Sequence, residues 1–509
     1  MIRTARLTAT ATAVTLIMGA APALADVAPR EVWDTWQSAY ATLGMTMTPG
    51  SESEDGDTLT LRDVVLSIDH DDDASLNGTI PEINLTDQGD GTVLITMSPE
   101  YDMVLTVDPA EDEQFTATIV VQLPGLETVA SGEVSTLTYD VTAPKVGIAM
   151  TGASEDGAAM TIDAQLDDVV ATYSLFGEGA EQTFGYDMVS EALSVSAIAT
   201  PPADEDEAEA ESDGAGLVNM AWRVETLRGQ ASGDLALLSP SADSATGDTS
   251  LAYNIVHGPQ AFSMDVTDPE AQTMVVDGSS EAGAIDFAMS DGAMAYMTRA
   301  EMLEIQVSGD SLPFSDLGAS MDVLNVALRG PVVPTETPED FAFNLNLGGL
   351  SVSDAVWDMI DSGQRLPRDP ATLLVDLSGK ARLLVDFWTS DDIDPEAEPG
   401  ELHALDLNEL KLSVAGADLT GDGSFTFDNA DKTTFEGMPA ADGELNLKLV
   451  GGNTLLDTLV TMGILPQEQA MGARMMLGLF ATPGEGDTLT SKIEVRPDGS
   501  VSANGQRLK

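Results

Sequence analysis

Hydrophobic and polar residues alternate along most of the chain, in stretches that clusters of Gly, Asp, Pro and Ser separate. An alternation with a period of two indicates strands with one buried face. Regular strands with turn residues between them are typical of antiparallel sheets. The pattern predicts a mainly β protein built of large curved antiparallel sheets. Among its strands we expect short, separate ones at 135–141, 145–151, 159–164, 168–175 and 235–238.

Helical spacing replaces this alternation in a few places. At the N-terminal side, Val32, Trp36, Ala39 and Leu43 recur at helical intervals, so we expect a helix over 28–43. A second, short helix is predicted at 354–361, where a proline-containing connector follows.

The last part of the chain, 443–509, predicts a closing module. A strand at 444–450 leads to a helix that Asn453 can cap and that Gly463 can end. Pro466 suits the start of the next helix, 467–481. Strands at 488–496 and 500–508 then form a hairpin around Pro-Asp-Gly.

The helix at 467–481 is apolar around most of its circumference, and Arg474 is its only charged residue after Gln469. Such a helix is either buried or in contact with something apolar. We favour a core helix beneath a sheet. The alternative is a methionine-rich lip that touches lipid or a partner, because methionine adapts to irregular apolar surfaces. Its candidate ligand-binding residues are Met471, Met475 and Leu479.

A strongly acidic segment divides the chain. Residues 201–214 contain seven acids and no base, and like-charge repulsion predicts a disordered loop or linker. It separates a first β arm (26–200, including the N-terminal helix) from a second (215–442). The closing module continues the second arm. The sequence leaves open whether the arms form one sheet or two domains.

The N-terminus has the features of a secretory signal peptide. Arg3 and Arg6 precede an apolar run from Leu7 to Met18, and Ala23-Leu-Ala25 offers a cleavage site before Asp26. The run is too short to span a membrane, and no later stretch is long enough. Cysteine is absent, whereas animal secreted domains often carry disulfides. We therefore expect a bacterial periplasmic protein without a transmembrane segment in its mature chain.

The formal charge of the chain is −65. Residues 1–25 carry two arginines and no acid, so their removal makes the charge two units more negative. This balance argues against binding nucleic acid, whose phosphates need clustered basic residues. It also argues against electrostatic binding to anionic lipid head groups.

No catalytic, cofactor or metal site is predicted. His70, His257 and His403 lie far apart and lack metal-ligand spacing. Residues 418–423 begin like a calcium loop, but position twelve is Asn429, so we interpret them as a solvated turn. The polar cluster of Arg365, Arg368 and Asp369 is interpreted as fixing the connector through hydrogen bonds to carbonyls.

The segment from Leu366-Pro-Arg-Asp-Pro to Leu373, with the helix before it, resembles the alphaproteobacterial domain-of-unknown-function 2125 family. Phe435-Glu-Gly-Met-Pro-Ala-Ala-Asp-Gly443 and Met471-Gly-Ala-Arg-Met-Met476 are similar to the same family. The resemblance implies a periplasmic or envelope-associated protein and supplies no catalytic residues.

Three functional hypotheses follow. The leading one is a non-enzymatic envelope protein that holds an apolar, lipid-like ligand in a sheet-lined groove. The alternative is a structural or assembly protein that binds another envelope protein. A hydrolase comes third, and would require histidine and carboxylates to converge in one pocket.

Overall fold

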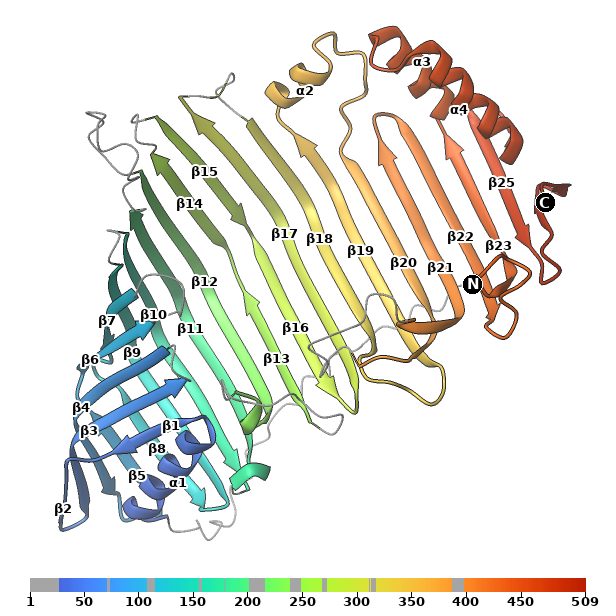
Figure 1. Cartoon of the computed structure of the whole chain (residues 1–509). Coiled ribbons are helices and arrows are strands. Elements are labelled where there is room, and N and C mark those ends of the chain that lie inside the picture. Colours follow the sequence, from blue (N-terminus) through green and yellow to red (C-terminus); the bar gives the residue numbers. More distant parts are fainter. Residues whose placement is uncertain are drawn as a thin grey trace, which may run out of the picture.

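The protein forms one long, curved antiparallel sheet with helices at both ends (Figure 1). The computed structural model describes residues 27–509 except 71–73, 108–114, 155–157, 178, 201–215, 239–248, 268–271, 311, 313–316 and 387–397. The predicted signal peptide and the whole of the predicted acidic linker lie outside the described residues. The mainly β fold with curved antiparallel strands is confirmed.

The elements of the first part precede the acidic segment. They are α1 (Pro29–Thr42), β1 (Met45–Thr48), β2 (Ser51–Asp55), β3 (Thr58–His70), β4 (Ala74–Asp87), β5 (Val93–Met97), β6 (Glu100–Val107), β7 (Phe115–Gln122), β8 (Glu127–Glu133), β9 (Thr136–Ser154), β10 (Ala159–Phe176), the 3-10 helix η1 (Gly179–Glu181) and β11 (Thr183–Thr200).

The elements of the second part follow it. They are β12 (Leu217–Asp234), the 3-10 helix η3 (Leu235–Leu238), β13 (Leu251–His257), β14 (Gln260–Thr267), β15 (Thr273–Ser280), β16 (Ala282–Ser290), β17 (Ala293–Gly309), β18 (Leu317–Pro331), β19 (Glu339–Val352), α2 (Asp354–Ile360), β20 (Ala371–Leu383), β21 (Gly400–Val414), β22 (Ala417–Asp428), β23 (Ala440–Val450), α3 (Gly452–Met462), α4 (Gln467–Phe480), β24 (Thr482–Pro483), β25 (Thr488–Val495), β26 (Val501–Ala503) and β27 (Gln506–Arg507). The predicted strand at 235–238 is wrong, because these residues form η3.

A strand pattern occurs twice in the sheet. Between the long strands β4 and β9 lie two shorter strand pairs, one after the other along the strand direction: β5 with β8, and β6 with β7. Two short pairs, β13 with β16 and β14 with β15, lie between β12 and β17 in the same arrangement. The fold therefore contains a structural repeat that the sequence pattern does not reveal.

Several strands are longer than predicted. The expected strands 159–164 and 168–175 are one strand, β10, and 135–151 is likewise one strand, β9. Within β10, Asp168 has a left-handed φ of 46°, and Pro144 of β9 lies opposite it. A left-handed residue bends a strand, and a proline opposite has no N–H whose bond could be lost. The turn signals therefore mark a bend and do not end the strand.

The two arms belong to one sheet. β11 and β12, which flank the acidic segment, pair from Thr183↔Asp234 to Ala199↔Val218. This answers the question that the sequence left open.

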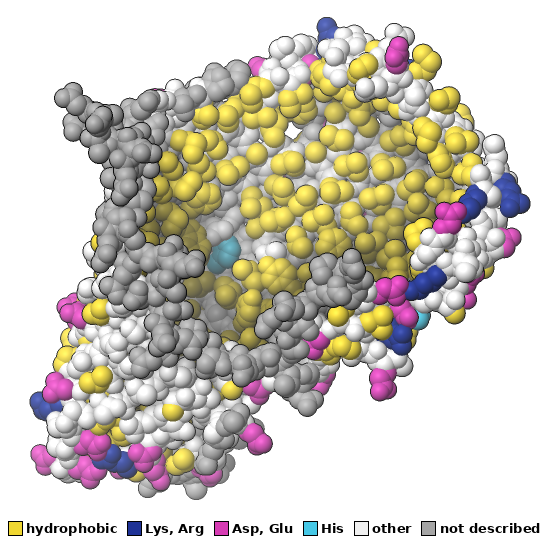
Figure 2. All heavy atoms as spheres, viewed as in Figure 1, with side chains coloured by type: hydrophobic (Ala, Val, Ile, Leu, Met, Phe, Trp, Pro, Cys, Tyr) yellow, Lys and Arg dark blue, Asp and Glu magenta, His cyan; other side chains and the backbone are white. Residues whose placement is uncertain are grey.

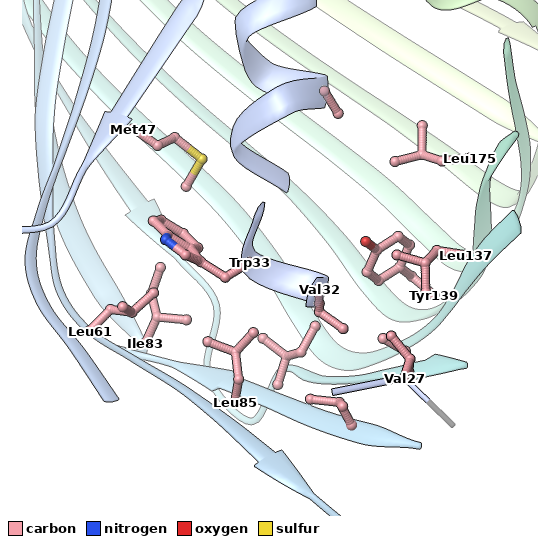
Figure 3. Close-up of a cluster of buried hydrophobic side chains, with 14 of the residues drawn as sticks. Val27, Val32, Trp33, Met47, Leu61, Ile83, Leu85, Leu137, Tyr139 and Leu175 are labelled. Atoms are coloured by element: carbon pink, nitrogen blue, oxygen red, sulfur yellow. The ribbon is translucent and has the colours of Figure 1, made fainter. Parts of the chain in front are cut away.

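The predicted N-terminal helix, α1, lies across the first strands and covers a hydrophobic core (Figure 3). Val32 and Trp33 of α1 are buried against Leu61, Ile83 and Leu85, which come from β3 and β4. Burial of large apolar side chains of this kind stabilises each by about 1.5–3 kcal/mol. This cluster fixes α1 at one end of the sheet.

Helices α3 and α4 lie at the other end (Figure 1). Asn453 does not cap α3 as predicted. Instead, the Asp487 carboxylate accepts hydrogen bonds from the backbone N–H groups of Asn453 (3.3 Å) and Thr454 (2.7 Å). A carboxylate is a stronger acceptor than an amide and also interacts favourably with the helix dipole. The start of α3 is thus tied to the turn before β25.

Candidate functional site: an apolar concave face

One face of the sheet carries apolar residues across many strands. The row through Ile255 consists of residues that pair directly across neighbouring strands: Gly229, Ile255, Ile285, Thr298, Val326, Leu345, Val375 and Leu410. The next row on this face, through Tyr253, is aromatic and aliphatic, and Tyr253 stacks on Phe287 at 5.1 Å between ring centroids. Figure 2 shows this face as a hollow lined with hydrophobic side chains.

The residues between these two rows point to the other side of the sheet. They form a mostly polar row: Gln230, Asn254, Asp286, Met297, Ala327, Asn344, Asp376 and Glu409. Alternate residues of a strand face opposite sides. The protein therefore exposes its polar residues on the outer face and keeps the concave face apolar.

The apolar face continues across the bend. In a regular strand Leu166 and Val169 of β10 would face opposite sides, yet both belong to one hydrophobic cluster. The left-handed Asp168 between them breaks the alternation. Thr226 has a left-handed φ at the equivalent place in β12. On the far side of this bend, the side chain of Trp222 lies on the apolar face and pairs with Phe262 of β14.

Much of this face is accessible. The exposed fraction of its large side chains is 37% for Trp222, 39% for Phe262, 37% for Ile255, 42% for Ile305, 36% for Leu328 and 38% for Leu412. From β12 to β23 the sheet is ten strands wide, which corresponds to about 43 Å at the usual strand spacing. Contiguous apolar surfaces of such extent mark binding sites.

At the N-terminal end the face passes into the core beneath α1. Trp36 of α1 stacks on Tyr139, with 6.2 Å between ring centroids, and Tyr139 stacks on Tyr173 at 6.1 Å. Tyr173 pairs with Tyr186, which is the next aromatic residue along the face. Burial raises the pKa of Tyr173 to about 12, so its hydroxyl is neutral at physiological pH.

At the C-terminal end α3 and α4 cover part of the face and leave a pocket of about 510 Å³. Its floor comes from β21, β22 and β23, and its roof from the two helices. It is lined by Leu412, Val414, Ala417, Leu419, Leu449, Gly452, Leu455, Leu456, Ala473, Met476, Leu477 and Phe480. Every lining residue is apolar or glycine, so the pocket suits hydrocarbon.

The outer side of α4 is exposed. Met471, Met475 and Leu479 are 62%, 74% and 44% exposed, and their spacing of four places them on one stripe of the helix. None of the three lines the pocket, whereas Met476 and Phe480 do. The expectation of a buried core helix is wrong, because within α4 only Ala470 is buried.

The part of the chain that carries the open apolar face also matches a known family. Residues 191–508 match the family described as "Uncharacterized protein conserved in bacteria (DUF2125)". The chain belongs to the DUF2125 family. The DUF2125 match spans β12 to β27, the open part of the apolar face and both covering helices. No curated protein and no solved structure matches the chain.

In this DUF2125 protein, the connector after α2, residues 361–370, is tied to α2 through Arg368 and to α3 through Arg365. The Asp361 carboxylate, 2% exposed, accepts the backbone N–H groups of Arg365 (2.6 Å) and Leu366 (2.7 Å). The Arg365 guanidinium donates to the Thr461 carbonyl in the last turn of α3 (2.9 Å). Arg368 forms ion pairs with acids of α2 and lies over the Trp357 ring. The predicted hydrogen bonds to carbonyls are confirmed for Arg365, which donates to Thr461, and for Arg368, which donates to the Asp361 carbonyl at 3.4 Å. The carboxylate of Asp361 was not predicted to take part.

The described residues contain no cluster of His, Asp and Glu placed to hold a metal ion. The expected turn at 418–423 is wrong, since these residues lie inside strand β22. His257 ends β13, and His403 of β21 lies 3.4 Å from Glu401. The side chain of His70 is outside the described part.

Two open troughs, of about 780 and 690 Å³, lie on the outer face. The first includes Glu304 and Gln306 but not Ile305, and the second includes Asp376 but not Leu377, as the alternation of a strand requires for that side. Both linings combine polar side chains with apolar ones, whereas the pocket beneath α3 and α4 has no polar lining residue. The apolar concave face therefore remains the candidate site of this DUF2125 protein.

Within the described ranges, no helix combines the length and the apolar character that crossing a membrane requires.

Proposed function

We propose that this protein is an exported, non-catalytic protein that binds the hydrocarbon chains of lipids on its concave face. The observation that carries the proposal is the accessible apolar face, which continues from the core under α1 to the pocket under α4. The signal-peptide features of residues 1–25 favour the periplasm as its location.

Hydrocarbon fits this face better than a folded protein surface does. Protein interiors are close-packed, so a pocket of about 510 Å³ lined by leucine, methionine and phenylalanine offers contacts that only an apolar chain can complete. The face is also concave, as Figure 2 shows, and about 43 Å wide. A flexible chain can follow such a surface along its length.

The expected affinity follows from burial. Each buried methylene contributes about 0.8 kcal/mol, so about twelve contribute about 10 kcal/mol before the cost of immobilising the ligand. Subtracting a cost of at least about 4 kcal/mol for immobilising the ligand leaves about 6 kcal/mol, so we expect dissociation constants of about tens of micromolar when twelve methylenes are buried, and lower ones for longer chains.

The test is to express the full chain with export, purify it from the periplasm, and identify copurified molecules by mass spectrometry after organic extraction. Titration with a fluorescent polyene hydrocarbon measures binding directly, and an extracted lipid should displace the probe. A protein that carries no lipid and does not bind the probe would refute the proposal.

The exposed stripe of α4 supports a second candidate, in which Met471, Met475 and Leu479 bind another envelope protein. Met475→Asp would then abolish a specific complex recovered by crosslinking in the periplasm while probe binding remains. If Met475→Asp retained both the complex and probe binding, a docking role for the stripe would be contradicted.

A further inference from the structure

Polar side chains interrupt the apolar face where the strand pairs β13–β16 and β14–β15 meet. His257 is the last residue of β13, Gln260 is the first of β14, and Ser280 is the last of β15. We propose that these three residues form a polar subsite for the uncharged head group of a lipid such as an acylglycerol. The proposal rests on the proposed function, because it concerns a ligand of the same face.

The register brings the three residues together. Gln260 pairs with Ser280, and His257 pairs with Gly283. The two pairs are three residues apart on each side, which corresponds to about 10 Å along the strands. The imidazole of His257 lies over Gly283, since a Cβ at that glycine would collide with Nε2. Figure 2 shows a histidine side chain inside the hydrophobic hollow.

Gln260 shares the apolar face with aromatic residues. It precedes Phe262 by two positions, so both side chains lie on one side of β14. The indole Nε1–H of Trp222, which pairs with Phe262, donates to Gln260 Oε1 at 3.1 Å. An indole can only donate, so this contact fixes the orientation of the amide and leaves the Gln260 NH₂ group to serve a ligand.

Ser280 provides an independent indication of a ligand. It is 4% exposed, and its Oγ has no hydrogen-bond partner among the described residues. A buried polar atom without a partner costs about 1–3 kcal/mol, and native proteins rarely retain one. A ligand hydroxyl or carbonyl would complete it.

The donors and acceptors suit an alcohol and an ester. His257 Nδ1 lies 2.8 Å from the Gly258 carbonyl, which can only accept, so Nδ1 carries the proton. Nε2 of the neutral ring is then an acceptor for a ligand hydroxyl. The Gln260 NH₂ can donate to an ester carbonyl, and the Ser280 hydroxyl can donate or accept.

An anionic head group does not fit, because no cation shares this face in the surrounding strands. The arginines of β12, β17 and β18 alternate with the apolar residues and lie on the outer face: Arg223, Arg228, Arg299 and Arg329. A carboxylate or phosphate would therefore be desolvated without a counter-ion. The subsite should select acylglycerols over fatty acids and phospholipids.

The experiment compares monooleoylglycerol, oleate and the polyene hydrocarbon in binding titrations with the full chain. The wild type should bind monooleoylglycerol more tightly than oleate. Gln260→Leu and Ser280→Ala should each weaken monooleoylglycerol binding by about three- to tenfold, as expected for one net hydrogen bond, and leave the polyene unaffected. The matched control is Ser279→Ala, whose exposed side chain faces outward.

Ser280→Ala also separates a binding role from a structural one. Removing an unpartnered hydroxyl should leave the melting temperature of the free protein unchanged or raised, and only the ligand-induced increase should shrink. The subsite would be overturned if wild type and Ser280→Ala bound monooleoylglycerol with equal affinity, or if the wild type bound oleate more tightly than monooleoylglycerol. Binding of the polyene in the same experiment would still support the proposed groove. Absence of binding of all three compounds would overturn both proposals.

Discussion

A charge placed on the concave face should prevent ligand binding without unfolding the protein. Ile255 lies in the centre of this face and is 37% exposed. Full burial of such a side chain is worth about 1.5–3 kcal/mol, so Ile255→Asp, which loses about two-thirds of that burial, should cost about 1–2 kcal/mol in the free protein. In the complex the carboxylate would be covered by hydrocarbon, and an uncompensated buried charge costs about 3–5 kcal/mol. Each 1.4 kcal/mol is tenfold, so affinity should fall by at least about a hundredfold.

Urea unfolding and titration with the polyene probe measure the two effects separately. The matched control is Val256→Asp, which adds the same charge one residue along, on the outer face opposite Arg228. Val256 is more buried than Ile255, so this variant should lose about as much stability, of which the cross-strand pair of opposite charges with Arg228 offsets about 0.2–1 kcal/mol. It should bind the probe as the wild type does. Unchanged probe affinity in Ile255→Asp would refute binding on the concave face. An equal loss of probe affinity in both variants would show that the added negative charge, and not its position, is responsible.

Other properties give further predictions. Met475→Asp should change the free energy of unfolding by less than about 0.5 kcal/mol, because Met475 is 74% exposed; a loss of several kcal/mol in urea unfolding would restore the core interpretation of α4. Asp361→Ala should cost at least about 2 kcal/mol in the same assay, since two backbone donors lose their acceptor, and an unchanged midpoint would contradict the role of the connector. Hydrogen bonds from Thr434 and Thr433 hold the pKa of Asp431 below its usual range. The difference in melting temperature between wild type and Asp431→Ala should therefore stay constant from neutral pH to about pH 5 and shrink below about pH 4, where the unfolded carboxyl takes up its proton first; a difference that grows on acidification would show the opposite sign. With a formal charge of −65, the melting temperature should rise between low salt and about 0.15 M sodium chloride, and a flat response would indicate that specific pairing already neutralises the acids.

Local patterns were sufficient for the type of most elements. The alternation of apolar and polar residues predicted the strands, and α1, α2, α3 and α4 begin and end close to the predicted residues. Strand ends were less predictable. Asp168 looks like a turn residue, yet the strand continues through it because hydrogen bonds with β9 and β11 resume on both sides. Backbone pairing with neighbours, which is not local information, decides whether a bend ends a strand.

The sequence alone determined that one side of each strand is apolar, that α4 is apolar around most of its circumference, and that cysteine chemistry is absent. Only the tertiary structure decided which of these apolar surfaces are covered. Burial depends on what packs against a residue, and the sheet curves around a hollow that α1 and α3–α4 cover only at its ends (Figure 1). The same is true of the polar subsite, because Gln260 and Ser280 are twenty residues apart in the chain and meet only through the β14–β15 register. Periodicity specifies the face of each strand, whereas the contacts between distant strands make that face a site.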